Sequence, residues 1–161
     1  MAIERKFFRP PVGHSFLFGL RGTGKSTWLL NALPSALWVD FLSPAQQRIY
    51  AARPERLREL VAANPGTNDV VIDEVQRVPE LLTVVHQLIE RPHCPRFVLT
   101  GSSSRTLKRA GVDLLAGRAT LRIMHPFIAA ELGSRFSLDA AIEVGLLPIV
   151  WDARDPADTL N

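Results

Sequence analysis

The chain has 161 residues and a formal net charge of +3, and its hydrophobic and charged fractions of 47% and 22% are ordinary for a soluble globular protein. This length is enough for one domain with a sizeable core. Cys94 is the only cysteine, which excludes an internal disulfide, and no apolar run is long enough to cross a membrane, so we expect a cytoplasmic protein without a membrane partner.

The first predicted strand covers residues 15–18 and leads into Gly19-Leu20-Arg21-Gly22-Thr23-Gly24-Lys25-Ser26, which fits the phosphate-binding pattern G-x-x-x-x-G-K-[ST]. A predicted helix over residues 28–33 completes the strand–loop–helix context that the pattern requires. The glycines let the backbone bring its N–H groups close to phosphate oxygens. Lys25 supplies charge for the β- and γ-phosphates, and Ser26 supplies a hydroxyl for Mg²⁺. The alternative is a glycine-rich turn that binds no ligand.

The next predicted elements are a strand over residues 36–41 and two helical stretches between Ser43 and Val61. A third strand is predicted over residues 69–74, and its run of Val and Ile indicates burial on both faces of a sheet. This strand ends in two adjacent acidic residues, so two carboxylates are expected at its carboxyl end.

Asp73 and Glu74 are these carboxylates. Asp73 can hold Mg²⁺ together with Ser26, and a carboxylate beside the γ-phosphate can orient and polarise an attacking water. The pair favours hydrolysis, because water needs a base, whereas an acceptor alcohol would need its own pocket. The alternative is that the pair caps the helix that follows.

The second half of the chain continues the alternation. Pro79 opens a predicted helix that runs to residue 89, and a fourth strand covers residues 97–100. Gly101-Ser102-Ser103-Ser104 then turns into a short helix that ends near Gly111. Residues 119–124 alternate apolar and polar side chains, as a half-exposed edge strand does.

Two further helices are predicted, from Pro126 to Gly133 and from about Ser137 to Val144, and residues 146–161 show no clear periodicity. The alternation predicts an α/β domain with a mostly parallel sheet. Such sheets bind ligands at the carboxyl ends of their strands. Because the phosphate-binding loop and the polar residues after the third and fourth strands all lie at such ends, we expect them to form one site.

Two residues outside these motifs are further candidates. Ser102 follows the fourth strand, where its hydroxyl can contact the γ-phosphate or the attacking water, or can simply cap a helix. Arg118 precedes the fifth strand, and an arginine can stabilise the charge that develops during phosphoryl transfer. The alternative for Arg118 is an ordinary surface arginine.

Four segments together resemble one protein family. LFGLRGTGKSTWL, VVIDEVQRVPELL, FVLTGSSSRTL and LLAGRA look like the bacterial and archaeal AAA-type ATPases whose P-loop domain is followed by a C-terminal domain of unknown function. The resemblance covers roughly residues 3–160. It implies ATP, Mg²⁺ and a P-loop three-layer sandwich with a five-stranded sheet, in which the phosphate-loop strand lies near the centre.

The resemblance also implies site residues. The nucleotide-binding residues would be Gly19, Gly22, Thr23, Gly24, Lys25, Ser26 and Thr27. The metal ligands would be Ser26 and Asp73. The catalytic residues would be Lys25, Glu74, Ser102 and Arg118.

Members of that family are longer, so we expect residues 1–161 to form a single P-loop ATPase domain, with residues 146–161 as the start of a missing C-terminal region. We expect Mg²⁺-dependent hydrolysis of ATP, weak in this short form. The alternatives are a nucleotide-binding switch or truncated remnant with little turnover and, less favoured, a small-molecule kinase. A homo-oligomer is compatible with the sequence, and no nucleic-acid partner is indicated.

Overall fold

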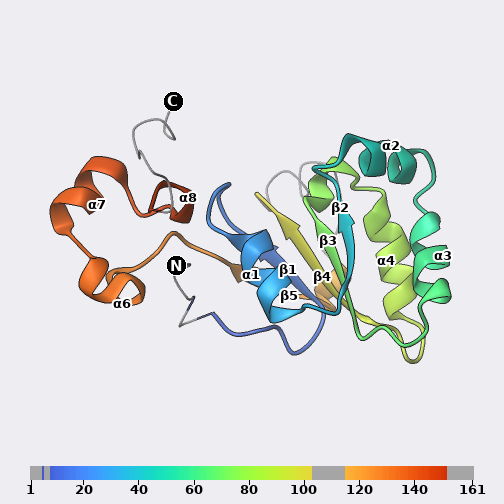
Figure 1. The fold of residues 1–161 in the computed structure, drawn as a ribbon. Coiled ribbons are helices and arrows are strands. Elements are labelled where there is room, and N and C mark those ends of the chain that lie inside the picture. Colours follow the sequence, from blue (N-terminus) through green and yellow to red (C-terminus); the bar gives the residue numbers. More distant parts are fainter. Residues whose placement is uncertain (1–4, 6–7, 103–114, 152–161) are drawn as a thin grey trace.

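The computed structural model describes residues 5, 8–102 and 115–151 (Figure 1). Within these residues, five parallel strands form one sheet in the order β2-β3-β4-β1-β5. Their bounds are Ser15–Phe18 (β1), Leu37–Asp40 (β2), Asp69–Asp73 (β3), Arg96–Gly101 (β4) and Thr120–Ile123 (β5). The predicted α/β fold is confirmed. The phosphate-loop strand β1 lies between β4 and β5, and β5 is an edge strand as predicted.

Helices cover both faces of this sheet (Figure 1). Alternate side chains of a strand point to opposite faces, so Leu17 joins a buried cluster with Leu29 of α1 (Lys25–Ala32), while Phe16 and Phe18 belong to a second cluster. That second cluster takes in the apolar face of α4 (Leu81–Ile89) and Leu57 of α3 (Arg56–Ala63). The result is the predicted three-layer arrangement.

The helices begin where the local sequence allows. α2 (Pro44–Ala52) has Ser43 as its cap, whose hydroxyl accepts a bond from the Gln46 N–H at 3.5 Å, with proline in the first turn. α1 begins at Lys25, three residues earlier than predicted, so the loop lysine lies in the first turn. Pro79 precedes α4, and a short 3₁₀ turn, η1 (Val75–Arg77), follows β3.

Among the described residues after β5 there are three short α-helices: α6 (Ala129–Leu132), α7 (Leu138–Val144) and α8 (Pro148–Trp151). They lie apart from α2, α3 and α4 (Figure 1). α7 matches its prediction, whereas α6 ends before Gly133 as predicted but begins at Ala129 rather than at Pro126. α8 falls in a segment predicted to lack periodicity. The predicted helix ending near Gly111 lies outside the described residues. Within the described part of the chain, no helix is both long and apolar enough to span a bilayer.

Candidate functional site

The carboxyl ends of β1, β3 and β4 border a hollow of about 400 Å³. Seven of the predicted site residues line it: Gly22, Gly24, Lys25, Ser26, Thr27, Glu74 and Ser102. Residues that were not predicted also line it, among them Gln76, Arg77 and Ile149. The topology therefore brings three separate segments to one place, because parallel strands all end at the same edge of the sheet.

The loop between β1 and α1 needs glycine at three positions. Gly22 and Gly24 have φ of 84° and 81°, a left-handed backbone that is costly for residues with a Cβ. Gly19 has a different reason, since a Cβ there would lie 2.3 Å from the carbonyl oxygen of Met124. The glycines of the motif thus answer a steric demand in this fold.

Lys25 is buried, with 5% of its surface exposed. Its Nζ donates to the carbonyl oxygens of Gly19 at 2.8 Å and Leu20 at 3.1 Å. Burial lowers the pKa of Lys25, and the nearby charges of Glu74 and Asp73 oppose that shift. The loop thus holds an ammonium whose hydrogen-bonded partners are uncharged carbonyls, an arrangement suited to receiving a polyanion.

Asp73 connects two motifs through its carboxylate. Ser26 Oγ donates to Asp73 Oδ2 at 2.6 Å, and the buried Thr100 hydroxyl donates to Oδ1. Thr100 Oγ1 also accepts the Glu74 N–H at 3.1 Å. Sequence reasoning missed Thr100, although its place as the last side chain of an apolar strand was a usable signal. The threonine holds the Asp73 carboxylate toward Ser26.

Glu74 has a left-handed backbone, with φ 59° and ψ 47°, at the start of η1. Such a conformation costs about 1 kcal/mol or more for a residue with a Cβ, so it must be stabilised by its surroundings. The Glu74 side chain makes no capping bond, so its role is not that of a helix cap. Its carboxylate instead accepts a bond from Gln76 Nε2.

Gln76 extends this contact toward the fourth strand. Its Nε2 also lies 3.4 Å from Ser102 Oγ, and its buried Oε1 has no hydrogen-bond partner within the part of the chain that the structure describes. Glu74, Gln76 and Ser102 therefore form one polar row along the hollow. No sequence pattern identified Gln76, because its role depends on the turn that follows β3.

Arg118 is not brought to this hollow. It lies just before β5, and the start of β5 pairs with the start of β1, where Thr120 N donates to the His14 carbonyl oxygen. In a parallel sheet the strand starts and strand ends lie at opposite edges, so Arg118 is at the far edge from Lys25. Its guanidinium forms a close ion pair with Glu90 instead.

Arg5 contacts the phosphate-binding loop from the N-terminal segment. Its Nη2 donates to the Thr23 carbonyl oxygen at 2.6 Å, and its Nη1 lies 3.2 Å from Glu131 Oε2 on α6. The guanidinium also stacks over Phe127, 4.4 Å from the ring centroid. Burial lowers the pKa of Arg5, and Glu131 opposes the shift. Nothing in the sequence distinguished this arginine from its basic neighbours.

Replacing Arg5 with methionine is expected to destabilise the fold by about 3 kcal/mol, because it leaves Glu131 charged and buried without its partner. The measurement is the free energy of unfolding from urea denaturation. Replacing Glu131 with methionine as well should recover a large part of the loss, since the uncompensated charge is gone. If the free energy of unfolding of the Arg5→Met variant lies within about 0.5 kcal/mol of the parent, the range of ordinary surface substitutions, the ion pair between Arg5 and Glu131 does not stabilise the fold.

Comparisons with known proteins agree with this architecture. A family model described as an AAA domain matches residues 13–133. Two curated relatives, Mb2031c of Mycobacterium bovis and Rv2008c of Mycobacterium tuberculosis, both named as uncharacterized proteins, are 31% identical over 159 residues. These alignments cover 98% of this chain and 34% of each relative, so the chain spans about a third of their length.

Among solved structures, the Walker-type ATPase PABY2304 of Pyrococcus abyssi superposes with a TM-score of 0.55 and 15% identity. The superposition covers 84% of this chain and 59% of that one. At this identity the likeness concerns the fold, which is the same layered arrangement around a parallel sheet.

Proposed function

The chain belongs to the AAA domain family, and on that premise we propose that it binds ATP with Mg²⁺ and hydrolyses it to ADP and phosphate. The observation that carries the proposal is the contact between Ser26 and Asp73, 2.6 Å apart, in the same hollow as Lys25 and Glu74. A phosphate-binding loop, a metal-ligand pair and a base are the parts that hydrolysis of a nucleoside triphosphate needs.

The loop residues hold the nucleotide. The backbone N–H groups between Gly22 and Ser26 face the phosphates at the start of α1, where the helix dipole favours negative charge. The Lys25 ammonium exchanges its two carbonyl partners for the β- and γ-phosphate oxygens. Arg5 keeps the loop in place by donating a hydrogen bond to the Thr23 carbonyl oxygen.

Ser26 and Asp73 would hold the metal, either directly or through water. A hydroxyl and a carboxylate oxygen are the hard ligands that Mg²⁺ prefers. When bound there, Mg²⁺ neutralises charge on the phosphates and orients them. The Thr100 hydroxyl fixes the Asp73 carboxylate so that its second oxygen stays directed to Ser26.

Glu74 acts on water. Its carboxylate takes a proton from a water molecule while the water oxygen forms a bond to the γ-phosphorus and the bond to the leaving ADP oxygen breaks. Gln76 orients this carboxylate through its Nε2, and Ser102 lies at the end of the same polar row. The bond between Gln76 and Glu74 gives the base a defined position before substrate arrives.

The direct test is steady-state release of phosphate from γ-labelled ATP with Mg²⁺, compared with the same reaction in EDTA. The proposal expects free phosphate and ADP in equal amounts. A label that appears on a small acceptor instead would indicate a kinase. Binding of ATP without release of phosphate above a no-enzyme control would indicate a nucleotide-holding switch.

Asp73→Asn should weaken the Mg²⁺ dependence of ATP binding, because an amide oxygen is a poorer ligand for a hard cation than a carboxylate. The measurement is ATP affinity across a magnesium titration. Asp40→Asn is the matched control, since Asp40 is the register partner of Asp73 at the end of β2 but does not line the hollow. A magnesium titration of Asp73→Asn that superposes on the parent curve would remove Asp73 from the metal site.

Arg118→Ala should leave ATP affinity of the isolated chain within about twofold of the parent, because Arg118 lies at the opposite edge of the sheet and its exposed ion pair contributes about 1 kcal/mol or less. A role on the nucleotide of a neighbouring subunit stays a prediction. Mixing Arg118→Ala with Glu74→Gln chains tests it: action in trans should restore turnover at some sites. No rescue in mixtures shown to co-assemble would count against it.

A further inference from the structure

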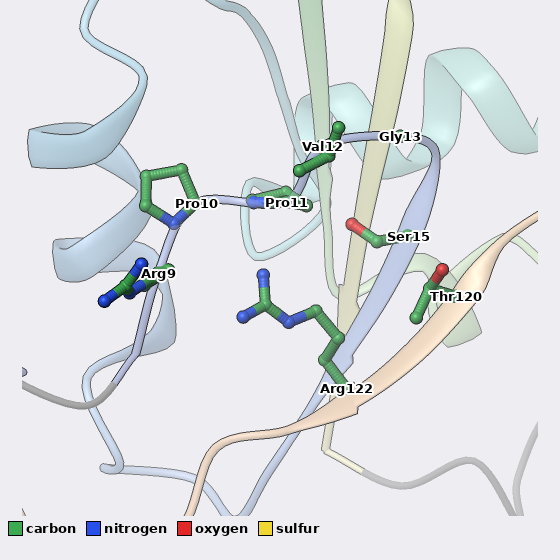
Figure 2. A pocket seen from close by; sticks show the side chains of 8 residues that line it. All are labelled: Arg9, Pro10, Pro11, Val12, Gly13, Ser15, Thr120 and Arg122. Carbon is green, nitrogen blue, oxygen red and sulfur yellow. The ribbon is translucent and has the colours of Figure 1, made fainter.

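A second hollow, of about 340 Å³, lies at the opposite edge of the sheet, beside the starts of β1 and β5 (Figure 2). Its walls are Arg9, residues 10–13, Ser15, Thr120 and Arg122. Ser15 pairs with Thr120 and Leu17 pairs with Arg122 across the two strands, so these side chains share the face of the sheet that α1 covers. This hollow and the ATP site have no lining residue in common.

The charged side chains that line this second hollow are all positive among the described residues. Two arginines, Arg9 and Arg122, line it, and none of its lining residues among those that the structure describes is a carboxylate. Figure 2 shows the Arg122 guanidinium directed toward Pro11, whereas the Arg9 guanidinium is directed away from it. Within the described ranges 5, 8–102 and 115–151, neither Arg9 nor Arg122 has a carboxylate partner. Arg122 rests over Phe8, 4.5 Å from the ring centroid, which leaves its N–H groups available to another acceptor.

The Ser15 hydroxyl is a second, independent indication that a ligand binds here, because it lacks a hydrogen-bond acceptor among the described residues. The Ser15 side chain is buried, with 1% of the residue exposed, and Oγ has no hydrogen-bond partner among the described residues. A buried hydroxyl without a partner costs about 1–3 kcal/mol. Figure 2 shows this hydroxyl and the Arg122 guanidinium on the same side of the two strands, facing the Pro10–Val12 segment.

Pro10 and Pro11, which form another wall of the hollow, offer few hydrogen-bonding groups of their own. Pro10 and Pro11 have no N–H group, and the Pro11 carbonyl already accepts a bond from Arg96. The donors directed into the hollow are therefore guanidinium and hydroxyl groups. Together they match an oxyanion, which accepts hydrogen bonds on several oxygens and is bound most strongly by arginine.

We propose that this hollow binds the phosphate or carboxylate group of a small molecule through Arg122 and the Ser15 hydroxyl, with Arg9 adding positive charge at the rim. The volume lies at the lower end of the range for small-molecule pockets, about 300–1,000 Å³. Arg122 takes the anion bidentately, and Ser15 donates to the same group. The proposal is independent of ATP hydrolysis, because the two sites lie at opposite edges of the sheet.

Amide chemical shifts of the ¹⁵N-labelled full chain test this proposal site by site. One arm titrates inorganic phosphate and the other titrates succinate, each against sodium chloride at equal ionic strength. The proposal expects saturable shifts at Gly13, Ser15, Thr120 and Arg122 with at least one of the two anions. The arm that saturates identifies the group as phosphate or carboxylate. Binding of phosphate to the ATP site is read separately, from amides of residues 19–26.

Arg122→Gln should weaken this binding by at least about tenfold, since each charge-assisted hydrogen bond supplies about that factor, and Ser15→Ala should weaken it severalfold. Arg48→Gln, an exposed arginine on α2, is the control and should bind as the parent does. If Arg122→Gln does not fold, Ser15→Ala carries the test by itself. Saturable shifts absent with both anions, or unchanged affinity in the Arg122 and Ser15 variants, would overturn the proposal.

Discussion

Lys25→Ala is expected to weaken ATP binding by at least about a hundredfold, because it removes the ammonium that we propose to contact both the β- and γ-phosphates, each contact worth about 1.5–3 kcal/mol. The loop geometry should survive. Gly22 and Gly24 set its left-handed bends, Gly19 allows the close approach of Met124, and Arg5 holds the Thr23 carbonyl, so the loop keeps these supports when Lys25 is replaced.

The measurement is equilibrium binding of a non-hydrolysable ATP analogue in the presence of Mg²⁺. Asn31→Ala, at an exposed position near the other end of α1, is the control and should bind like the parent. Lys25→Arg should also bind the analogue more weakly than the parent, although it keeps the positive charge. The reason is that a planar guanidinium does not replace a compact ammonium at a position this buried. Undiminished binding by a folded Lys25→Ala variant would end the interpretation of residues 19–26 as a phosphate-binding loop.

Glu74→Gln is expected to keep ATP affinity within about threefold of the parent and to lower turnover by a factor of about 10²–10⁴, the usual contribution of a positioned base. The amide preserves the shape of the side chain, and its oxygen can still accept the bond from Gln76. The variant therefore removes the proton acceptor while leaving the row that includes Gln76 and Ser102 in place.

The measurement is phosphate release under single-turnover conditions, so that product release does not mask the chemical step. Glu80→Gln is the matched control, because it makes the same change at an exposed position just before α4. If Glu74→Gln hydrolyses ATP at the parent rate, water is activated by another group, and Glu74 serves only to connect β3 with Gln76. Loss of both affinity and turnover would instead indicate that Glu74 positions the nucleotide.

The parts of the site that the sequence determines by itself are those with a local physical cause. The loop at residues 19–26 needs glycine at positions 22 and 24 because its own backbone takes left-handed conformations there, which is a local requirement. The run of Val and Ile before Asp73 predicts a buried parallel strand, and such strands deliver their last residues to one edge. These two facts were enough to predict that Ser26 and Asp73 approach each other.

Only the tertiary structure decided which side chains complete the site. Thr100 reaches Asp73 across 27 positions of sequence, and Arg5 reaches Glu131 across 126. Arg118 was predicted at the site from its motif, yet the direction of β5 places it at the opposite edge, beside Glu90. The physical reason is that backbone conformation and hydrophobic periodicity are local, whereas hydrogen-bond and ion-pair partners depend on which strands become neighbours. That order, β2-β3-β4-β1-β5, is set by the packing of the whole domain.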